Sequence, residues 1–264
     1  MDSLLPAFDP SGEPYSFTEF APDALNATWG ALRVHSLAYR PDDDLDARLR
    51  AWPLPSTDDR DTAAVVTVPS RDLTAADALA RHGFAPLVVL AARPAGRVGV
   101  PSDAFSGDVR PMTGDDVEAV TAINLETVRY DGHFGMVNER PSTEGVLRGR
   151  IAGLLERDEP CSWVAEVDGR VVGALNYDLP GHSEWVAGRT SVRPVAYVGL
   201  LGVLPSFRGG GVGGALAAVA HERLDAAGVG VTLLHHAAPN PRSTPFWYSQ
   251  GYRPLWTSWQ RRPC

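Results

Sequence analysis

The sequence predicts an α/β fold, because segments with the pattern of strands alternate with segments of helical spacing. The clearest segment is an apolar run at 195–204, which predicts a buried strand and is followed by a glycine-rich turn and a helix ending at Gly228. The order strand, helix, strand also occurs twice, at about 62–94 and again at 231–261. With 264 residues, 44% of them hydrophobic, the chain can bury the core of one large domain or of two small ones.

The internal repeat is defined by matching residues as well as by element order. Residues 82–87 (HGFAPL) align with 250–255 (QGYRPL) at a constant offset of 168 positions. No glycine-rich turn precedes the first copy, so we interpret that copy as degenerate. We therefore predict a truncated N-terminal domain at 1–97, a linker at 98–107 and a complete domain at 108–264.

The N-terminal part is predicted element by element, although prolines interrupt the first 60 residues. Apolar spacing at 25–37 predicts a helix. The three aspartates at 42–44 predict an N-terminal cap and an acidic first turn for a helix at 45–54. The sequence then predicts a strand, a helix and a second strand at 63–68, 73–83 and 86–94.

The second domain is predicted to begin with a short strand at 108–112. Thr113 caps the following helix, whose first turn is acidic. Asp168-Gly169 predicts a tight hairpin between two strands. The other predicted segments are a loop, a helix, the two hairpin strands and a polar loop before the central strand, at 130–142, 143–157, 161–167, 170–177 and 182–192.

The turn after the central strand is typical of a phosphate site. Its backbone N–H groups and the positive end of the following helix converge on one place, and glycines let an anion come close. A P-loop is excluded because Ala215 and Leu216 stand where Lys and Ser or Thr are needed. The dinucleotide fingerprint is met formally, but the acidic residue about 20 positions further on is missing.

The third pattern is R-x-x-G-x-G, met by Arg208, Gly211 and Gly213, and it resembles the acetyl-CoA loop of the GNAT superfamily of N-acetyltransferases. The closing segment is also similar, with a strand ending at Asn240, a short helix and then glycine and an aromatic residue. The resemblance covers about 109–261. It implies a mixed, mostly antiparallel sheet with helices on both faces, and acetyl transfer from acetyl-CoA to a primary amine by direct attack in a ternary complex.

Two other functions stay open at this point. One is an acyl-CoA-binding sensor or scaffold without turnover, and the other is a nucleotide-binding oxidoreductase. For the cofactor, the resemblance implies that the central strand holds the pantetheine arm, that the N–H of Val203 stabilises the oxyanion, and that the turn holds the pyrophosphate. The implied cofactor-binding residues are Leu201, Gly202, Val203, Arg208, Gly209, Gly210, Gly211, Val212, Gly213, Gly214 and Asn240.

A general base must take a proton from the attacking amine. The central strand carries no Asp or Glu, so we predict that His235 or His236, at the end of the next strand, serves this role. Asp131 and His133 lie in the loop that lines the acceptor pocket in the family and are predicted to bind the substrate. For all four side chains the alternative is ordinary structural or surface polarity.

The general acid departs from the family pattern. The usual tyrosine is replaced by Trp247, whose indole N–H does not release a proton, and Tyr248 follows one residue later. If Pro245 delays the start of the helix, Tyr248 turns inward. We therefore predict that Tyr248 acts as the acid while Trp247 packs as a wall of the site.

Composition restricts the partners. A net charge of −8 and a pI of about 5.3 argue against binding to nucleic acid or to an anionic membrane. Cys161 and Cys264 make no disulfide framework, and no cluster predicts a metal site. The N-terminus has neither a signal peptide nor a membrane span, and the absence of lysine resembles GC-rich bacterial coding. We expect a cytoplasmic monomer or homodimer that acts on an amine of a small molecule or peptide.

Overall fold

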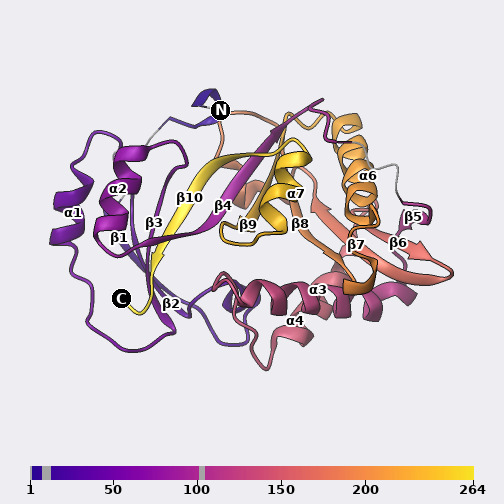
Figure 1. The fold of residues 1–264 in the computed structure, drawn as a ribbon, viewed down its shortest axis with the longest axis horizontal. Coiled ribbons are helices and arrows are strands. Elements are labelled where there is room, and N and C mark those ends of the chain that lie inside the picture. Colours follow the sequence, from indigo (N-terminus) through magenta and orange to yellow (C-terminus); the bar gives the residue numbers. More distant parts are fainter. Residues whose placement is uncertain (1, 8–12, 101–104) are drawn as a thin grey trace.

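The computed structural model describes residues 2–7, 13–100 and 105–264 (Figure 1). The strands are β1 (Tyr15–Glu19), β2 (Arg33–Leu37), β3 (Thr62–Pro69), β4 (Ala85–Pro94), β5 (Asp108–Pro111), β6 (Ser162–Val167), β7 (Arg170–Asp178), β8 (Val195–Val203), β9 (Val231–Ala237) and β10 (Arg253–Arg261). The α-helices are α1 (Leu45–Ala51), α2 (Leu73–Arg81), α3 (Val117–Gly132), α4 (Thr143–Leu154), α5 (Glu184–Ala187), α6 (Val212–Ala226) and α7 (Ser243–Ser249). Short 3₁₀ helices are η1 (Asp2–Leu4), η2 (Leu25–Trp29), η3 (Gly114–Asp116) and η4 (Pro205–Phe207).

One sheet runs through both halves of the described chain. Its strand order is β1-β2-β3-β10-β4-β9-β8-β7-β6-β5. Neighbouring strands of this sheet are antiparallel, apart from the parallel pairs β2–β3 and β8–β9. The predicted mixed, mostly antiparallel α/β fold is therefore confirmed.

The two repeat copies exchange their last strands. The copies are β3-α2-β4 and β9-α7-β10, and they agree with the predicted repeat. β4 of the first copy pairs with β9 of the second, and β10 of the second pairs with β3 of the first. In Figure 1 the yellow β10 runs beside the purple β4, to which it is also hydrogen-bonded. Each half of the chain therefore completes the sheet of the other half.

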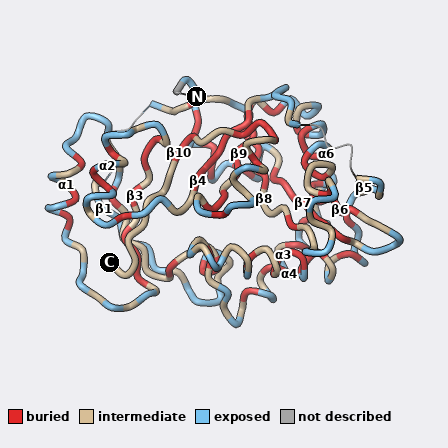
Figure 2. The backbone as a smooth tube through the Cα atoms, in the orientation of Figure 1, coloured by how far each residue is buried: buried red, intermediate tan, exposed pale blue. Residues whose placement is uncertain are grey.

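The exchange extends to the hydrophobic cores. Trp259 of β10 packs in the N-terminal core around Val66 and Leu79, under α1 and α2. Val89 and Ala91 of β4 lie in the large C-terminal core. Figure 2 shows buried residues concentrated along the central strands, whereas the edge strand β1 is exposed throughout. The domain limits near 97 and 108 stay a prediction, and residues 101–104 of the predicted linker lie outside the described residues.

Helices cover both faces of the C-terminal half of the sheet. A Cβ on Gly173 would lie 2.7 Å from Val212 of α6, and a Cβ on Gly202 would lie 2.5 Å from Ile123 of α3. Gly202 pairs with Ala174, the neighbour of Gly173, and successive residues of a strand point to opposite faces. Hence α6 and α3 lie on opposite faces of the sheet.

The N-terminal half also holds the α3–α4 connection, residues 133–142. Arg140 donates from Nε to the carbonyl oxygen of Ala27 at 2.6 Å and from Nη2 to Asp61 Oδ1 at 2.9 Å. Asn138 donates from Nδ2 to the carbonyl oxygen of Gly30 at 2.6 Å. Because the side chain of Arg140 is only 12% exposed, this contact is part of the packed structure. This connection makes up most of the predicted acceptor loop at 130–142, and η2 and the residues around it anchor it.

Two local predictions need correction. The predicted helix at 25–37 is wrong: the chain forms η2, turns at Gly30 and continues as β2, because β2 pairs along its whole length with β3. The polar loop at 182–192 contains the short helix α5, which buries Val186. The predicted cap before 45–54 is confirmed, since Asp44 accepts a hydrogen bond from the backbone of Ala47. None of the described helices is both long and apolar enough to span a bilayer.

Candidate active site

The central strands β8 and β9 separate towards their C-terminal ends. They pair only where 195–197 of β8 faces 231–233 of β9. Further along, β8 follows β7 and β9 follows β4. A bulge between β7 and β8 accompanies the separation, and there Asn176 Oδ1 accepts from the N–H of Leu200 at 2.8 Å. A Cβ on Gly199 would overlap that oxygen, so glycine leaves room for the side chain of Asn176 at the bulge.

The turn after β8 has the backbone of an anion site. Gly209 and Gly211 have φ values of 80° and 81°, the left-handed region that favours glycine. Gly211 immediately precedes α6, a helix of 15 residues. The free N–H groups of the first turn of α6 and the positive end of its dipole therefore face the same place as the turn.

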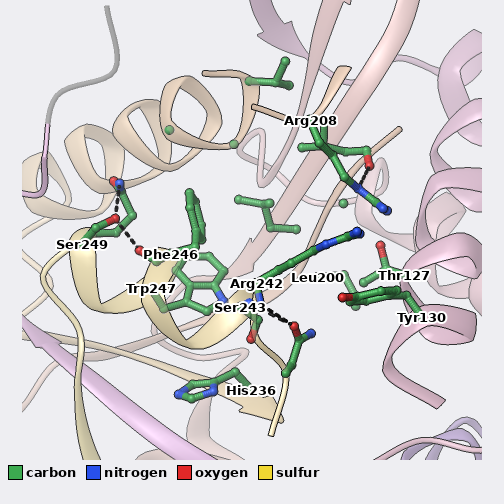
Figure 3. Close-up of a pocket in the computed structure, with 18 of the residues that line it drawn as sticks. Thr127, Tyr130, Leu200, Arg208, His236, Arg242, Ser243, Phe246, Trp247 and Ser249 are labelled. Carbon is green, nitrogen blue, oxygen red and sulfur yellow. Dashed lines mark hydrogen bonds between the residues drawn. The ribbon is translucent and has the colours of Figure 1, made fainter. Parts of the chain in front are cut away.

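A cavity of about 820 Å³ lies against this turn and the separated strands (Figure 3). It brings together most of the predicted site residues: Asp131, Leu201, Gly202, Val203, Arg208, Gly209, Gly211, Val212, Gly213, Gly214, His235, His236 and Asn240. Three predicted residues, Gly210, His133 and Tyr248, are not in its described wall. The wall also contains residues that the sequence did not single out, among them Val100, Thr127, Tyr130, Arg242, Ser243 and Phe246.

Arg208 lies between the end of β8 and α3. Its Nε donates to the carbonyl oxygen of Val203 at 3.0 Å. Its guanidinium carbon is 5.6 Å from the ring centre of Tyr130, and Glu126 is 3.8 Å from Nη2. The side chain therefore spans from the strand that was predicted to hold the pantetheine arm to the neighbouring helix.

Asn240 ties three elements together. Its Oδ1 accepts from the N–H groups of Arg242 and Ser243, at 2.8 and 3.1 Å, and thereby caps the start of α7. Its Nδ2 donates to Asp131 Oδ1, at the end of α3, at 2.7 Å. Burial raises the pKa of Asp131, and the bond from Asn240 acts against that rise. These bonds give Asn240 a structural role beside its predicted contact with the cofactor.

His236 is buried in the cavity wall, with 3% of its surface exposed. Its Nδ1 lies 3.2 Å from the carbonyl oxygen of Ala237, which can only accept, so Nδ1 carries the proton in that contact. Thr244 Oγ1 is a second neighbour of Nδ1 at 3.2 Å. The Nε2 atom is buried and has no hydrogen-bond partner among the described residues. Burial lowers the pKa of His236, which keeps the ring neutral and leaves a lone pair on Nε2.

His235 belongs to an aromatic cluster next to the cavity. Its Nδ1 is 2.9 Å from the hydroxyl oxygen of Tyr197, and its ring stacks on Trp185 at 6.2 Å. Burial, with contributions from Arg189 and His236, lowers the pKa of His235 to about 4. Both histidines have a hydroxyl neighbour at Nδ1, Tyr197 for His235 and Thr244 for His236. They differ at Nε2, which is buried and without a described partner in His236.

Trp247, rather than Tyr248, faces the cavity. The cap from Asn240 starts α7 at Ser243, so Pro245 lies in its first turn and does not delay the helix. The ring of Tyr248 packs edge-on against His236 at 5.6 Å between ring centres, outside the described wall. The condition under which Tyr248 was expected to turn inward is therefore not met.

Other candidates are engaged elsewhere or missing. Glu166 of β6, a carboxylate that could also take a proton, accepts from Arg110 Nη2 at 2.7 Å, outside the described cavity wall. Within residues 2–7, 13–100 and 105–264, no group of three or more His, Cys, Asp or Glu side chains is placed to hold a metal ion. The sequence did not predict Tyr130 and Arg242 as site residues, because they belong to different elements and lie 112 positions apart in the chain. Only the folded chain brings them together.

Comparison with known proteins agrees with this geometry. Residues 125–252 match the family model of the acetyltransferase (GNAT) family. A GCN5-related N-acetyltransferase from Sphaerobacter thermophilus has a TM-score of 0.59 at 17% identity, over 87% of this chain and 74% of that one. A functionally unknown conserved protein from Staphylococcus epidermidis has a TM-score of 0.53 at 12% identity, over 99% and 96%. A GNAT acetyltransferase from Colwellia psychrerythraea has a TM-score of 0.51 at 12% identity, over 74% and 63%. These TM-scores show a shared fold, and at such low identities the similarity shows no more than that. No curated protein matched the chain.

Proposed function

We propose that this chain, whose residues 125–252 match the family model of the acetyltransferase (GNAT) family, transfers an acetyl group from acetyl-CoA to a primary amine. The observation that supports the proposal is one cavity that contains both the separated ends of β8 and β9 and the glycine turn before α6. The turn suits a pyrophosphate, and the gap between the strands suits a narrow, uncharged arm. The amine attacks directly while both substrates are bound.

The residues of the turn fit the cofactor. Left-handed glycines expose backbone N–H groups that a side chain would screen, and Arg208 adds a guanidinium beside them. We assign the pyrophosphate to Arg208 and residues 209–214, and the pantetheine arm to Leu201, Gly202 and Val203. The N–H of Val203 would stabilise the oxyanion of the tetrahedral intermediate.

We assign the general base to His236. In the proposed step, the amine gives a proton to Nε2, its nitrogen bonds to the thioester carbonyl carbon, and the carbon–sulfur bond then breaks. The neutral ring and the vacant Nε2 atom support this choice over His235. The expelled CoA thiolate is a tolerable leaving group without an acid, since a thiol has a reference pKa of about 8.5.

Thiol release from acetyl-CoA with a panel of primary amines tests the proposal. We expect turnover with at least one amine and a loss of about 10²–10⁴-fold in His236→Asn, the usual contribution of a proton acceptor. His235→Asn is the matched control and should lose less. Binding of acetyl-CoA without thiol release for any amine would instead favour the sensor or scaffold. A protein that does not bind acetyl-CoA contradicts both functions.

The pH dependence follows from the lowered pKa of His236. A base works when deprotonated, so activity falls as the pH drops through the pKa of the folded protein. Because burial places that pKa below the ordinary value of about 6.5, we expect the acidic limb of kcat/KM below pH 6.5. The ammonium form of the acceptor adds its own limb near a pKa of about 10, so a limb well above pH 7 contradicts His236 as the base only if it stays in place when the amine is replaced by one of lower pKa.

A further inference from the structure

Two arginine side chains meet at one aromatic ring in the cavity wall. The guanidinium carbon of Arg242 is 4.5 Å from the ring centre of Tyr130, and that of Arg208 is 5.6 Å from it. Figure 3 shows both side chains directed towards Tyr130 and Thr127, Arg242 from the position before α7 and Arg208 from the turn after β8. All four residues line the cavity.

The charge of this group is poorly balanced by its neighbours. In the described part of the chain, no carboxylate lies within 4.0 Å of Arg242, and Arg208 has only Glu126 near that limit at 3.8 Å. Asp131, the acidic side chain of the described wall, is hydrogen-bonded to Asn240. Among the described residues, the guanidinium of Arg242 therefore lines the cavity without a paired carboxylate, in a chain whose net charge is −8.

The position of Arg242 is set by the backbone. Its N–H donates to Asn240 Oδ1, which fixes the start of the side chain directly before α7. Stacking on Tyr130 then occupies the face of the guanidinium and leaves its N–H donors at the edge. Such a planar fork matches two oxygens of a carboxylate or a phosphate.

We propose that Arg242, stacked on Tyr130, is a second anion-binding element of the cavity, separate from the backbone N–H groups of the turn, and that it takes a carboxylate or phosphate group of a substrate. The proposal rests on the proposed function for the identity of the substrates. Two sources supply this chemistry: the 3′-phosphate of CoA, and a carboxylate carried by the acceptor amine. Arg208 lies on the same ring and adds positive charge to the element.

Calorimetry on the full chain separates the two sources. Arg242→Gln is titrated with CoA and with dephospho-CoA, which lacks only the 3′-phosphate. In the presence of CoA it is also titrated with amino acids, each paired with the amine that lacks its carboxylate. Arg223→Gln is the matched control, because Arg223 is likewise an exposed arginine over an aromatic ring, 5.2 Å from Trp163, but does not line the cavity.

The proposal predicts one of two patterns. If the anion is the 3′-phosphate, Arg242→Gln weakens CoA binding about tenfold and leaves dephospho-CoA unchanged. If it is the acceptor's carboxylate, CoA binding is unchanged and an amino acid loses about tenfold, whereas its decarboxylated partner does not; both estimates assume one charge-assisted hydrogen bond. Arg242→Lys should recover only part of the loss, because it lacks the fork.

Unchanged affinity for every ligand in Arg242→Gln overturns the proposal, and so does an equal loss for both members of each pair. If the wild-type protein binds no CoA, the proposed function fails on its own. The anion element is then measured with inorganic pyrophosphate. Binding that is lost in Arg242→Gln supports the element, whereas equal binding or none overturns it.

Discussion

The two copies of the repeat share a scaffold but differ in what precedes them. In each, a parallel strand lies beside the first strand of the copy: β2 beside β3, and β8 beside β9. β2 pairs with β3 along all five of its residues, whereas β8 leaves β9 after three. The gap that contributes to the cavity therefore exists beside the second copy and is closed beside the first.

The helices that follow these parallel strands also differ in the residues at their N-termini. α6 begins after the left-handed Gly211, in the turn that we assign to the pyrophosphate. α1 begins after Asp44, and two further aspartates precede that cap. Carboxylates at a helix N-terminus occupy the N–H groups and repel a phosphate. The comparison shows that the two copies share a framework but differ in strand separation and in the residues at one helix start, and we propose that these two differences confine the cofactor site to the second copy.

The strand exchange gives the largest expected effect. A chain of residues 108–264 lacks β4, which leaves β9 unpaired on that side and β10 without either of its neighbours. We expect each half, expressed alone, to fail to give a folded monomer, and co-expressed halves to restore the circular dichroism and the unfolding transition. A folded, monomeric C-terminal half would show that the two copies are independent.

The glycine turn is tested by two matched substitutions at the ends of α6. Gly211 and Gly228 have φ values of 81° and 71°, so alanine strains the backbone similarly, by about 1 kcal/mol, at either place. Only Gly211 lines the cavity. We expect Gly211→Ala to weaken acetyl-CoA binding at least about tenfold, or about 1.4 kcal/mol, in calorimetry, and Gly228→Ala to leave it unchanged.

The same titration counts the sites. We expect one acetyl-CoA per chain, because the first copy has neither the separated strands nor the turn. Equal affinities of the two glycine variants for acetyl-CoA would contradict the assignment of the turn to the cofactor site. A stoichiometry of two would contradict the prediction that the first copy binds no cofactor.

The contact between the halves should have a moderate effect on stability. Asp61→Asn removes the carboxylate that pairs with Arg140, and we expect the free energy of unfolding in urea to fall by about 1–2 kcal/mol at pH 7. Arg140 lowers the pKa of Asp61, so its contribution is complete above the unfolded value of about 4 and is lost as the pH falls through the folded value. The difference between the proteins should therefore shrink by pH 3.

Glu118→Gln is the control for that measurement. Glu118 pairs with Arg148 within the C-terminal half, and both side chains are exposed, at 72% and 41%. Exposed pairs contribute little, so we expect a change below about 0.5 kcal/mol. An equally small change in Asp61→Asn would mean that the carboxylate of Asp61 contributes little to the contact between the halves.

The smallest effect is expected at α7. Tyr248 lies outside the described cavity wall, so Tyr248→Phe should keep turnover within about threefold of wild type, a change below 1 kcal/mol. Trp247→Phe alters the wall itself and should change turnover more. A loss of about 10²-fold or more confined to Tyr248→Phe would restore that hydroxyl as the general acid.

The sequence by itself determined the elements that depend on local spacing and on nearby residues. The turn after β8, the hairpin at Asp168-Gly169 and the cap at Asp44 were all predictable, because glycine conformation and capping act within a few residues. The repeat was visible too, since both copies keep the same glycine and proline positions. The helix predicted at 25–37 failed because pairing with β3, a contact distant in sequence, overrode the helical spacing.

The tertiary structure alone decided which strands are neighbours and which side chains meet. The features that the two copies share are the order strand, helix, strand and the Gly-aromatic-x-Pro-Leu segment, and these short-range features do not determine which last strand pairs with which first strand. The meeting of Tyr130 with Arg242 depends on α3 and α7 being tied by Asp131 and Asn240. The vacant Nε2 of His236 depends on burial by α7. These features arise from contacts between residues far apart in the chain, where spacing in the sequence carries no information.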